Sequence, residues 1–128
     1  MIVGIGTDII RIARMEEAWA RHGERLAERV LTPNERDVLR RHAAPLRYLA
    51  KRWAAKEAVA KALGTGIRAG VGFQSLEIFN DELGQPRVRL SDGALARLET
   101  LGGGQCWLSL SDEEAYAVAF AVISSAPE

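Results

Sequence analysis

A helix-forming segment that ends at a glycine-rich turn, residues 52–67, is the feature that most limits how this chain can fold. Ala, Lys, Glu and Leu dominate the segment, and these residues favour helices. Gly64 is a natural residue to end the helix, because it adopts a positive φ without a Cβ clash. Trp53, Glu57 and Lys61 are spaced four residues apart, so they lie on one side of the helix. The segment predicts a carboxylate one turn from a cation, followed by a Gly-Thr-Gly loop.

The chain opens with an apolar strand, residues 2–9, that has one charged residue, Asp8, near its end. Asp is disfavoured in strand interiors, and a charge at the end of an apolar strand needs water or a cation. Two carboxylates from distant segments, together with phosphate oxygens, form a typical magnesium site. Asp8 and Glu57 are therefore candidate Mg²⁺ ligands. Two alternatives stay open: Asp8 also suits the N-cap of a helix that begins near Arg11, and Glu57 with Lys61 also suits an ordinary exposed ion pair.

Composition limits the class of protein. The 128 residues predict a single domain, residues 1–128. Seventeen basic and seventeen acidic residues give no net charge, so we expect neither a nucleic-acid partner nor a membrane partner. No apolar run approaches the roughly 20 residues that a membrane helix needs. A single cysteine, Cys106, excludes an intrachain disulfide and fits a reducing compartment, so we expect a cytoplasmic protein.

Hydrophobic periodicity and turn residues predict an α+β fold in which a long helix packs against a small antiparallel sheet. The sequence near Thr32 has the pattern of a capping box. We expect a loop over residues 67–74, helices over 11–22, 24–30, 33–42, 45–64 and 92–101, and strands over 2–9, 76–80, 87–90, 106–111 and 116–123. The last strand is apolar on both faces, so it needs cover on both sides. Part of that surface is therefore expected to be a subunit interface.

Several motifs occur in a characteristic order along the chain. They are Gly4-Ile5-Gly6-Thr7-Asp8-Ile9, Trp53-Ala54-Ala55-Lys56-Glu57-Ala58, Gly64-Thr65-Gly66-Ile67, the turn over residues 79–86, and Ser109-Leu110-Ser111-Asp112. Each motif alone is weakly specific, but together they resemble the short bacterial members of the 4′-phosphopantetheinyl transferase family over nearly the whole chain. The resemblance implies that family's fold and a homotrimer with active sites between subunits.

The resemblance also implies a reaction: Mg²⁺-dependent transfer of 4′-phosphopantetheine from coenzyme A to a serine of acyl carrier protein, with release of 3′,5′-ADP, in fatty acid biosynthesis. Asp8, Glu57 and Lys61 would be the catalytic residues, and Asp8 and Glu57 the metal ligands. The base would be Glu57 or a metal-bound water. The residues implied for coenzyme A are Arg52, Lys61, Gly64, Thr65, Gly66, Ser109 and Ser111, with Lys56 a weaker candidate. Those implied for the carrier protein are Arg14, Arg21 and Arg25.

The nucleotide-binding serines are expected to come from a neighbouring subunit, and the glycine loop is expected to present backbone N–H groups to a phosphate or to the adenine. Some relatives have a histidine in the segment after Ser111, where this chain has Asp112, so no catalytic histidine is predicted.

Two other classes of protein remain as alternatives. A trimer that binds coenzyme A or the carrier without chemistry is one, although the presence of Asp8, Glu57 and Lys61 argues against it. A nucleotide pyrophosphatase that uses water as the nucleophile is the other. Such enzymes usually need more carboxylates for metal than these two. Carrier-dependent turnover distinguishes all three.

Overall fold

The computed structural model describes residues 1–68 and 70–127 and has the predicted α+β architecture. Its elements in chain order are β1 (Ile2–Arg11), α1 (Ile12–His22), α2 (Glu24–Val30), α3 (Pro33–Arg41), α4 (Pro45–Ala62), the 3-10 helix η1 (Phe73–Ser75), β2 (Leu76–Asn80), β3 (Pro86–Leu90), α5 (Asp92–Thr100), β4 (Gly103–Asp112) and β5 (Tyr116–Ser125). All the predicted helices and strands are present, with ends shifted by a few residues.

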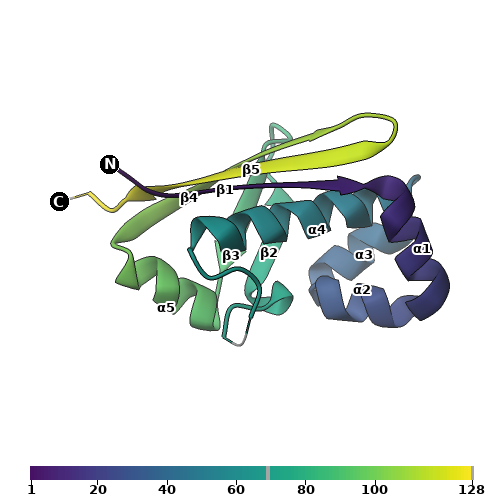
Figure 1. Ribbon diagram of the computed structural model, residues 1–128, viewed down its shortest axis with the longest axis horizontal. Coiled ribbons are helices and arrows are strands. Elements are labelled where there is room, and N and C mark those ends of the chain that lie inside the picture. The colour runs from purple at the N-terminus through teal and green to yellow at the C-terminus, as the bar shows by residue number, and fades with distance from the viewer. Residues whose placement is uncertain (69, 128) are drawn as a thin grey trace.

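The strands form two antiparallel units. β1, β5 and β4 form a three-stranded sheet in that order, so the last strand of the chain lies in the middle. β2 and β3 form a hairpin beside β4. In Figure 1, α4 runs along one face of the three-stranded sheet, α1–α3 gather at one end, and the two chain termini lie together at the other. On the opposite face of this sheet, side chains such as Ile5, Ile9 and Phe120 are exposed in the described part of the chain.

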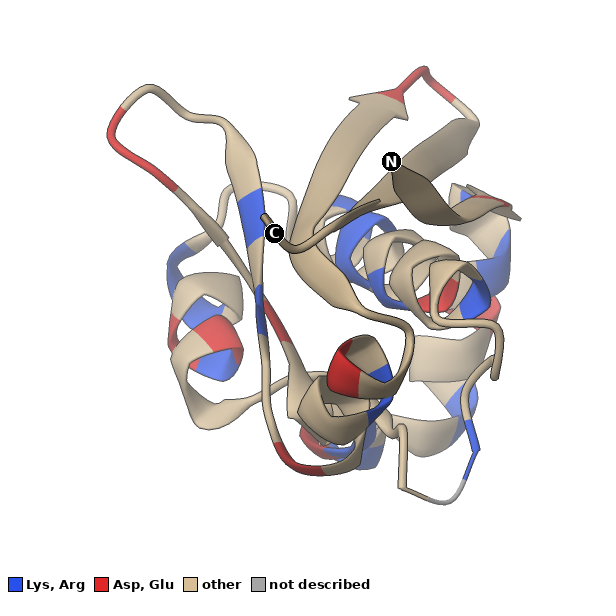
Figure 2. Ribbon diagram, turned by 90° about the vertical axis from the view of Figure 1, so that its left-hand side faces the viewer, with Lys and Arg blue, Asp and Glu red and all other residues tan. Residues whose placement is uncertain are grey.

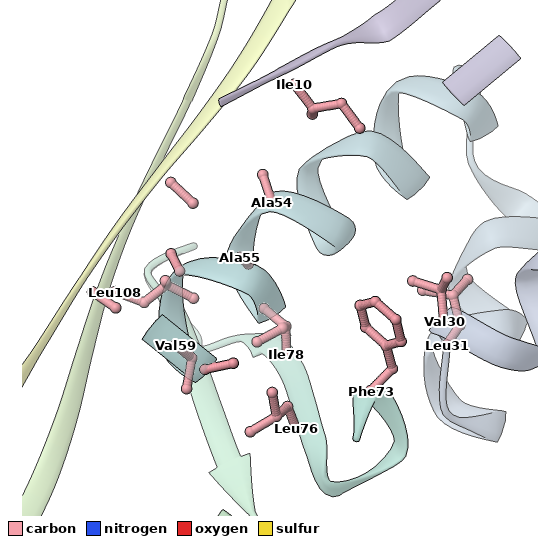
Figure 3. Packing of buried hydrophobic residues seen from close by; sticks show 14 of the residues in the cluster. Ile10, Val30, Leu31, Ala54, Ala55, Val59, Phe73, Leu76, Ile78 and Leu108 are labelled. Carbon is pink, nitrogen blue, oxygen red and sulfur yellow. The ribbon is translucent and has the colours of Figure 1, made fainter. Parts of the chain in front are cut away.

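Helix α4 lies at the centre of the hydrophobic core. Ala54, Ala55, Ala58 and Val59 are fully buried, and small alanine side chains let the sheet approach the helix closely. Figure 3 shows side chains from three parts of the chain around α4: Ile10 and Leu108 from the sheet, Val30 and Leu31 from the end of α2, and Phe73, Leu76 and Ile78 from the segment after the helix. The position and rotation of α4 are therefore fixed by packing on several sides.

A buried ion pair also holds α4 in place. The Lys56 ammonium donates to Oε1 of Glu35 at 2.6 Å and to the backbone oxygens of Val30 at 2.6 Å and Phe73 at 3.0 Å. The Glu35 carboxylate also accepts from the backbone N–H groups of Thr32 and Ile78, each at 2.8 Å. The bond to Thr32 is half of the predicted capping box of α3, which is confirmed. One lysine and one glutamate thus connect α2, α3, α4, η1 and β2.

Two local expectations need comment. The predicted loop over residues 67–74 contains a β-bridge between Arg68 and Val71 and leads into η1, while Ala69 within it lies outside the described residues. The alternative role of Asp8 as a helix cap is wrong, because α1 begins after Arg11 and Asp8 pairs with Ala119 within the sheet. Within residues 1–68 and 70–127, no helix is both long and apolar enough to cross a membrane.

Candidate active site

The first strand approaches α4 unusually closely at two glycines. A Cβ atom added to Gly4 would overlap the backbone oxygen of Ala62, and one added to Gly6 would overlap the backbone oxygen of Ala58. Side chains alternate between the two faces of a strand, so Asp8 lies on the same helix-facing side as these two glycines. The glycines of the opening motif therefore bring the Asp8 carboxylate next to α4, a role that sequence reasoning did not assign to them.

Asp8 contacts the stripe of residues predicted on one side of α4, namely Trp53, Glu57 and Lys61. The Lys61 ammonium donates to Oδ1 of Asp8 at 3.2 Å and to the backbone oxygen of Thr7 at 3.0 Å. The Asp8 side chain is 17% exposed and that of Lys61 is 51% exposed, so the ion pair is open to solvent on the lysine side. Glu57 lies one turn before Lys61 and is half-buried. The structure thus brings Asp8, Glu57 and Lys61 together, as the sequence predicted.

The electrostatics of the two carboxylates favour a cation between them. Burial raises the pKa of Glu57 above its usual 4.5, and the nearby negative charge of Asp8 raises it further, while Lys61 lowers it in part. Two like charges held close together in a partly desolvated site are relieved by a bound divalent cation. No cluster of three or more His, Cys, Asp or Glu side chains suited to a metal occurs among the described residues. Mg²⁺ is commonly held by one or two carboxylates, substrate phosphates and water, so the Asp8–Glu57 pair fits this ion.

A pocket of about 390 Å³ opens beside these carboxylates. Asp8 and Glu57 lie in its lining together with Trp53, the next residue of the stripe towards the start of α4. The rest of the lining comes from β1, α1 and α2 and consists of Ile9, Ile10, Arg14, Met15, Ala18, His22, Leu26 and Arg29. The candidate active site is therefore a half-apolar pocket with two carboxylates in its wall.

The Gly64-Thr65-Gly66 loop follows α4 but differs from expectation in one respect. Gly64 and Gly66 have positive φ angles of 82° and 66°, as a helix-ending turn requires. The three backbone N–H groups donate to α4 oxygens: Gly64 to Lys61, and both Thr65 and Gly66 to Ala60. These N–H groups already have partners within the chain and lie at the negative end of the helix dipole, so they are not free to donate to a phosphate or to the adenine as predicted. Whether the loop contacts coenzyme A in another way stays a prediction.

Two basic residues of α4 lie away from the carboxylate pair. Lys56 is fully buried and donates to three acceptors within the chain. The prediction that it is a weaker candidate for binding a nucleotide phosphate is therefore wrong. The Arg52 guanidinium is buried 4.6 Å over the Tyr48 ring and lines a different pocket. Its Nε is buried without a hydrogen-bond partner among the described residues. The single chain does not bring Arg52 to Asp8, and its contact with a nucleotide stays a prediction.

Ser109 and Ser111 lie on the far face of the sheet from α4. Both are exposed, and the intervening Leu110 and the neighbouring Leu108 point towards the core instead. Ser109 pairs with Phe120 and Ser111 with Val118, both exposed residues of β5. Within one chain, the serines cannot join the Asp8–Glu57 site. This placement agrees with the expectation that they serve a neighbouring subunit, which stays a prediction.

Two of the three basic residues predicted for the carrier protein line the pocket beside Asp8 and Glu57 or a hollow next to it. Arg14 lines the pocket itself, and Arg25 lines an adjoining hollow with His22 and Arg29. Arg21 is exposed in the last turn of α1. Sequence reasoning missed His22 and Arg29, because only the sharp turn at Gly23, with a φ of 55°, brings α1 and α2 around one pocket.

Asp112 has a structural role at the end of β4. Its carboxylate accepts from Arg47 at 3.0 Å and lies 3.3 Å from the Lys51 ammonium. Burial alone would raise the pKa of Asp112, but the hydrogen bonds and charges of Lys51 and Arg47 outweigh it and lower that pKa. Asp112 is therefore a paired carboxylate that links the sheet to the start of α4.

Comparison with known proteins agrees with this geometry. Residues 4–121 match the family described as the 4′-phosphopantetheinyl transferase superfamily. A relative named holo-[acyl-carrier-protein] synthase, from Escherichia coli O9:H4 (strain HS), is 54% identical over 124 residues, which cover 97% of this chain and 98% of the relative.

Solved structures agree as well. That of the holo-[acyl-carrier-protein] synthase from Neisseria meningitidis matches with a TM-score of 0.93 and 43% identity, over 98% of this chain and 100% of the other. That of the Bacillus anthracis holo-(acyl-carrier-protein) synthase in complex with CoA (3′,5′-ADP) matches with a TM-score of 0.83 and 38% identity, over 98% and 99%. The chain belongs to the 4′-phosphopantetheinyl transferase superfamily, and among the members compared it is similar to the holo-[acyl-carrier-protein] synthases.

Proposed function

We propose that this protein transfers 4′-phosphopantetheine from coenzyme A to a serine hydroxyl of acyl carrier protein. A bond forms between the serine oxygen and the phosphorus that bears the pantetheine arm, and the pyrophosphate bond breaks, so that 3′,5′-ADP leaves with the electron pair. The observation that supports this most is the approach of Asp8 on β1 to Glu57 on α4, in a chain 54% identical to a relative named for the synthase activity. The reaction serves fatty acid biosynthesis.

Asp8 and Glu57 would hold a Mg²⁺ ion in this reaction. The bound ion supplies charge neutralisation on the pyrophosphate as the bond to the leaving phosphate breaks. Lys61 adds a compact positive charge beside it, since its exposed ammonium is free to turn from Asp8 towards a phosphate. Asp8 would then have Mg²⁺ as its cationic partner in place of the Lys61 ammonium.

The base would be Glu57 or a metal-bound water. Burial and Asp8 raise the pKa of Glu57 in the metal-free chain, and a bound Mg²⁺ would favour its ionised form instead. The serine comes from the carrier, so the enzyme has only to orient the hydroxyl and accept its proton.

The trimer expected from the resemblance is part of the proposal. The face of the three-stranded sheet away from α4 presents exposed apolar side chains, among them Ile5 and Ile9 at 62% exposure each and Phe120 at 46%. Figure 2 shows few charged residues on these strands away from their ends. A large apolar face of this kind marks an interaction surface. Ser109 and Ser111 lie on it, so association through this face would place them against a neighbouring subunit.

Arg14, Arg21 and Arg25 would meet an acidic surface of the carrier. They lie on α1 and at the start of α2; Arg14 lines the pocket of Asp8 and Glu57, and Arg25 lines an adjoining hollow. Charge complementarity here would speed and orient docking more than it would tighten the complex. A cytoplasmic location is proposed on the same footing, supported by a lone cysteine, Cys106, that is a buried free thiol.

Intact-mass spectrometry of apo-acyl carrier protein tests the function. The carrier is incubated with the protein, coenzyme A and Mg²⁺, with and without EDTA. We expect the carrier to gain the mass of one phosphopantetheine only when the metal is present. Coenzyme A binding without any change in carrier mass would instead indicate a binding module, and coenzyme A cleavage without carrier modification would indicate a pyrophosphatase.

A further inference from the structure

The end of α4 is held by one side chain from α5. Nε of Arg97 donates to the backbone oxygen of Leu63, the residue that caps α4, at 2.8 Å. Among the described residues, this is the only hydrogen bond that joins α5 to the end of α4. Figure 1 shows α5 near the end of α4 that lies away from α1–α3. Arg97 therefore acts at the point where α4 passes into the Gly64-Thr65-Gly66 loop.

The turn at the end of α4 depends on Arg97 for its last acceptor. The backbone N–H groups of Gly64, Thr65 and Gly66 donate back to the oxygens of Lys61 and Ala60. They therefore satisfy carbonyl groups that lie before Leu63, and the Leu63 oxygen receives the guanidinium instead. Leu63 is fully buried, and a buried backbone oxygen needs a partner within the chain. Loss of the arginine would leave this oxygen without the bond.

The guanidinium of Arg97 also lies directly against the turn. A Cβ atom added to Gly64 would be 3.2 Å from Nη2 of Arg97. This places a positive charge beside the C-terminal end of α4, where the helix dipole is negative. Lys61 lies in the same last turn of the helix. The arginine thus offsets the negative end of α4 next to the lysine of the candidate active site.

Packing of α5 fixes the place of Arg97. Ala94, Arg97 and Leu98 are three and four residues apart, so they share one face of α5. Ala94 and Leu98 are buried in the core, and Arg97 is half-buried beside them. The arginine is therefore directed to α4 by the face of the helix on which it lies, unlike a solvated surface arginine.

We propose that Arg97 is a positioning residue for the binding of coenzyme A. Its bond to Leu63 holds the Gly64-Thr65-Gly66 loop in place, and its charge offsets the negative end of α4. The inference rests on the proposed function, in which Lys61 and this loop meet coenzyme A. The phosphates of coenzyme A are anionic, so a helix C-terminus without a compensating cation would repel them. Arg97 acts through the turn and does not itself touch the ligand.

Two substitutions separate the charge of Arg97 from its bulk. Arg97→Gln removes the charge and keeps a polar side chain, whereas Arg97→Lys keeps the charge on a different donor. Arg40→Gln is the matched control, because Arg40 is also a basic residue in the last turn of a helix, α3, where it forms an exposed pair with Asp37. Circular dichroism would show whether each variant is folded, and Arg97→Lys keeps the test valid if Arg97→Gln is not.

Carrier modification kinetics and isothermal titration with coenzyme A give the readout. We expect Arg97→Gln to raise the KM and the Kd for coenzyme A about tenfold, since a hydrogen bond and a favourable charge at the helix end are both lost. Arg97→Lys should show a smaller rise. The loss in Arg97→Gln should decrease as salt is added, because salt screens partly exposed charges. The kcat, the KM for the carrier and the behaviour of Arg40→Gln should match the unmodified protein.

Unchanged coenzyme A affinity in folded Arg97→Gln would overturn the inference. It would also be overturned by a fall in kcat with an unchanged KM for coenzyme A, which indicates only a smaller active fraction. Equal losses in Arg97→Lys and Arg97→Gln would exclude the role of the charge and so overturn it as well. If the unmodified protein bound no coenzyme A, the proposed function itself would fail, which is a separate result from a failure of the Arg97 variants.

Discussion

Helix α4 carries two lysine–carboxylate pairs that have the same chemistry and opposite surroundings. Lys56 and Glu35 are 0% and 1% exposed, and their atoms are 2.6 Å apart. Lys61 and Asp8 are 51% and 17% exposed and 3.2 Å apart. Lys56 donates to three fixed acceptors inside the core, whereas Lys61 donates at the surface to Asp8 and Thr7. Burial makes the first pair part of the fold, and exposure leaves the second pair free to exchange partners.

The difference explains how one helix supports both stability and chemistry. A buried charge that loses its partner is very costly, so the Lys56–Glu35 pair holds α4 in one rotation. Glu57 is the next residue along the chain, about 100° further around the helix, and it lies beside Asp8. The site needs a carboxylate that can release a lysine to accept a cation, and only the exposed pair can do so.

The largest effect is expected from breaking the buried pair. Lys56→Met would leave the Glu35 carboxylate buried without its cation, and we expect the free energy of unfolding to fall by about 3–5 kcal/mol. Urea denaturation at a fixed protein concentration measures it. A loss below about 1 kcal/mol, the value typical of surface pairs, would show that the two pairs do not differ as described.

Removing a carboxylate of the exposed site should have the reverse effect: a large loss of activity with little loss of stability. Asp8→Asn and Glu57→Gln each remove one proposed metal ligand, so we expect transfer to the carrier to fall at least about 100-fold, because metal neutralisation is worth several kcal/mol in the transition state. The free energy of unfolding should change little. Near-normal turnover in either variant would remove that residue from the site.

The exposed site and the buried ion pair show which parts of the fold and site could be predicted from the sequence. The Trp53–Glu57–Lys61 stripe and the acidic end of β1 were predictable because periodicity places residues on faces. The burial of Lys56 was not, because its partners Glu35, Val30 and Phe73 come from three segments that only tertiary packing brings together. The role of Gly4 and Gly6 was hidden for the same reason, since the helix oxygens that they avoid are more than 50 residues away in the chain.

The pH dependence of metal affinity and of stability should distinguish Glu57 from an ordinary surface glutamate. Its folded pKa is raised above 4.5 by burial and by Asp8. Protonation removes a metal ligand, so metal affinity should decrease as pH falls through this raised pKa. The sign for stability is opposite: a raised pKa stabilises the folded state at low pH, and this contribution is lost as pH rises through it. As pH rises through the raised pKa of Glu57, the free energy of unfolding of the unmodified protein should therefore fall relative to that of Glu57→Gln. Denaturation at a series of pH values would measure this difference.

The smallest effect on stability is expected from Lys61→Met. The lysine is about half exposed, so we expect its loss to change the free energy of unfolding by less than about 1 kcal/mol. The KM for coenzyme A should rise, since a charge near the phosphates is lost. A loss of stability comparable to that of Lys56→Met would contradict the comparison, and a KM equal to that of the unmodified protein would remove Lys61 from the phosphate site.

Direct metal binding tests the central claim most sharply. Mn²⁺, which shares the oxygen ligands of Mg²⁺, can be titrated by electron paramagnetic resonance in the presence of coenzyme A into the unmodified protein, Asp8→Asn, Glu57→Gln and Lys61→Met. The account predicts one bound Mn²⁺ per subunit that is lost in both carboxylate variants and kept in Lys61→Met. Tight Mn²⁺ binding that survives in Asp8→Asn and Glu57→Gln would place the metal elsewhere and contradict the account.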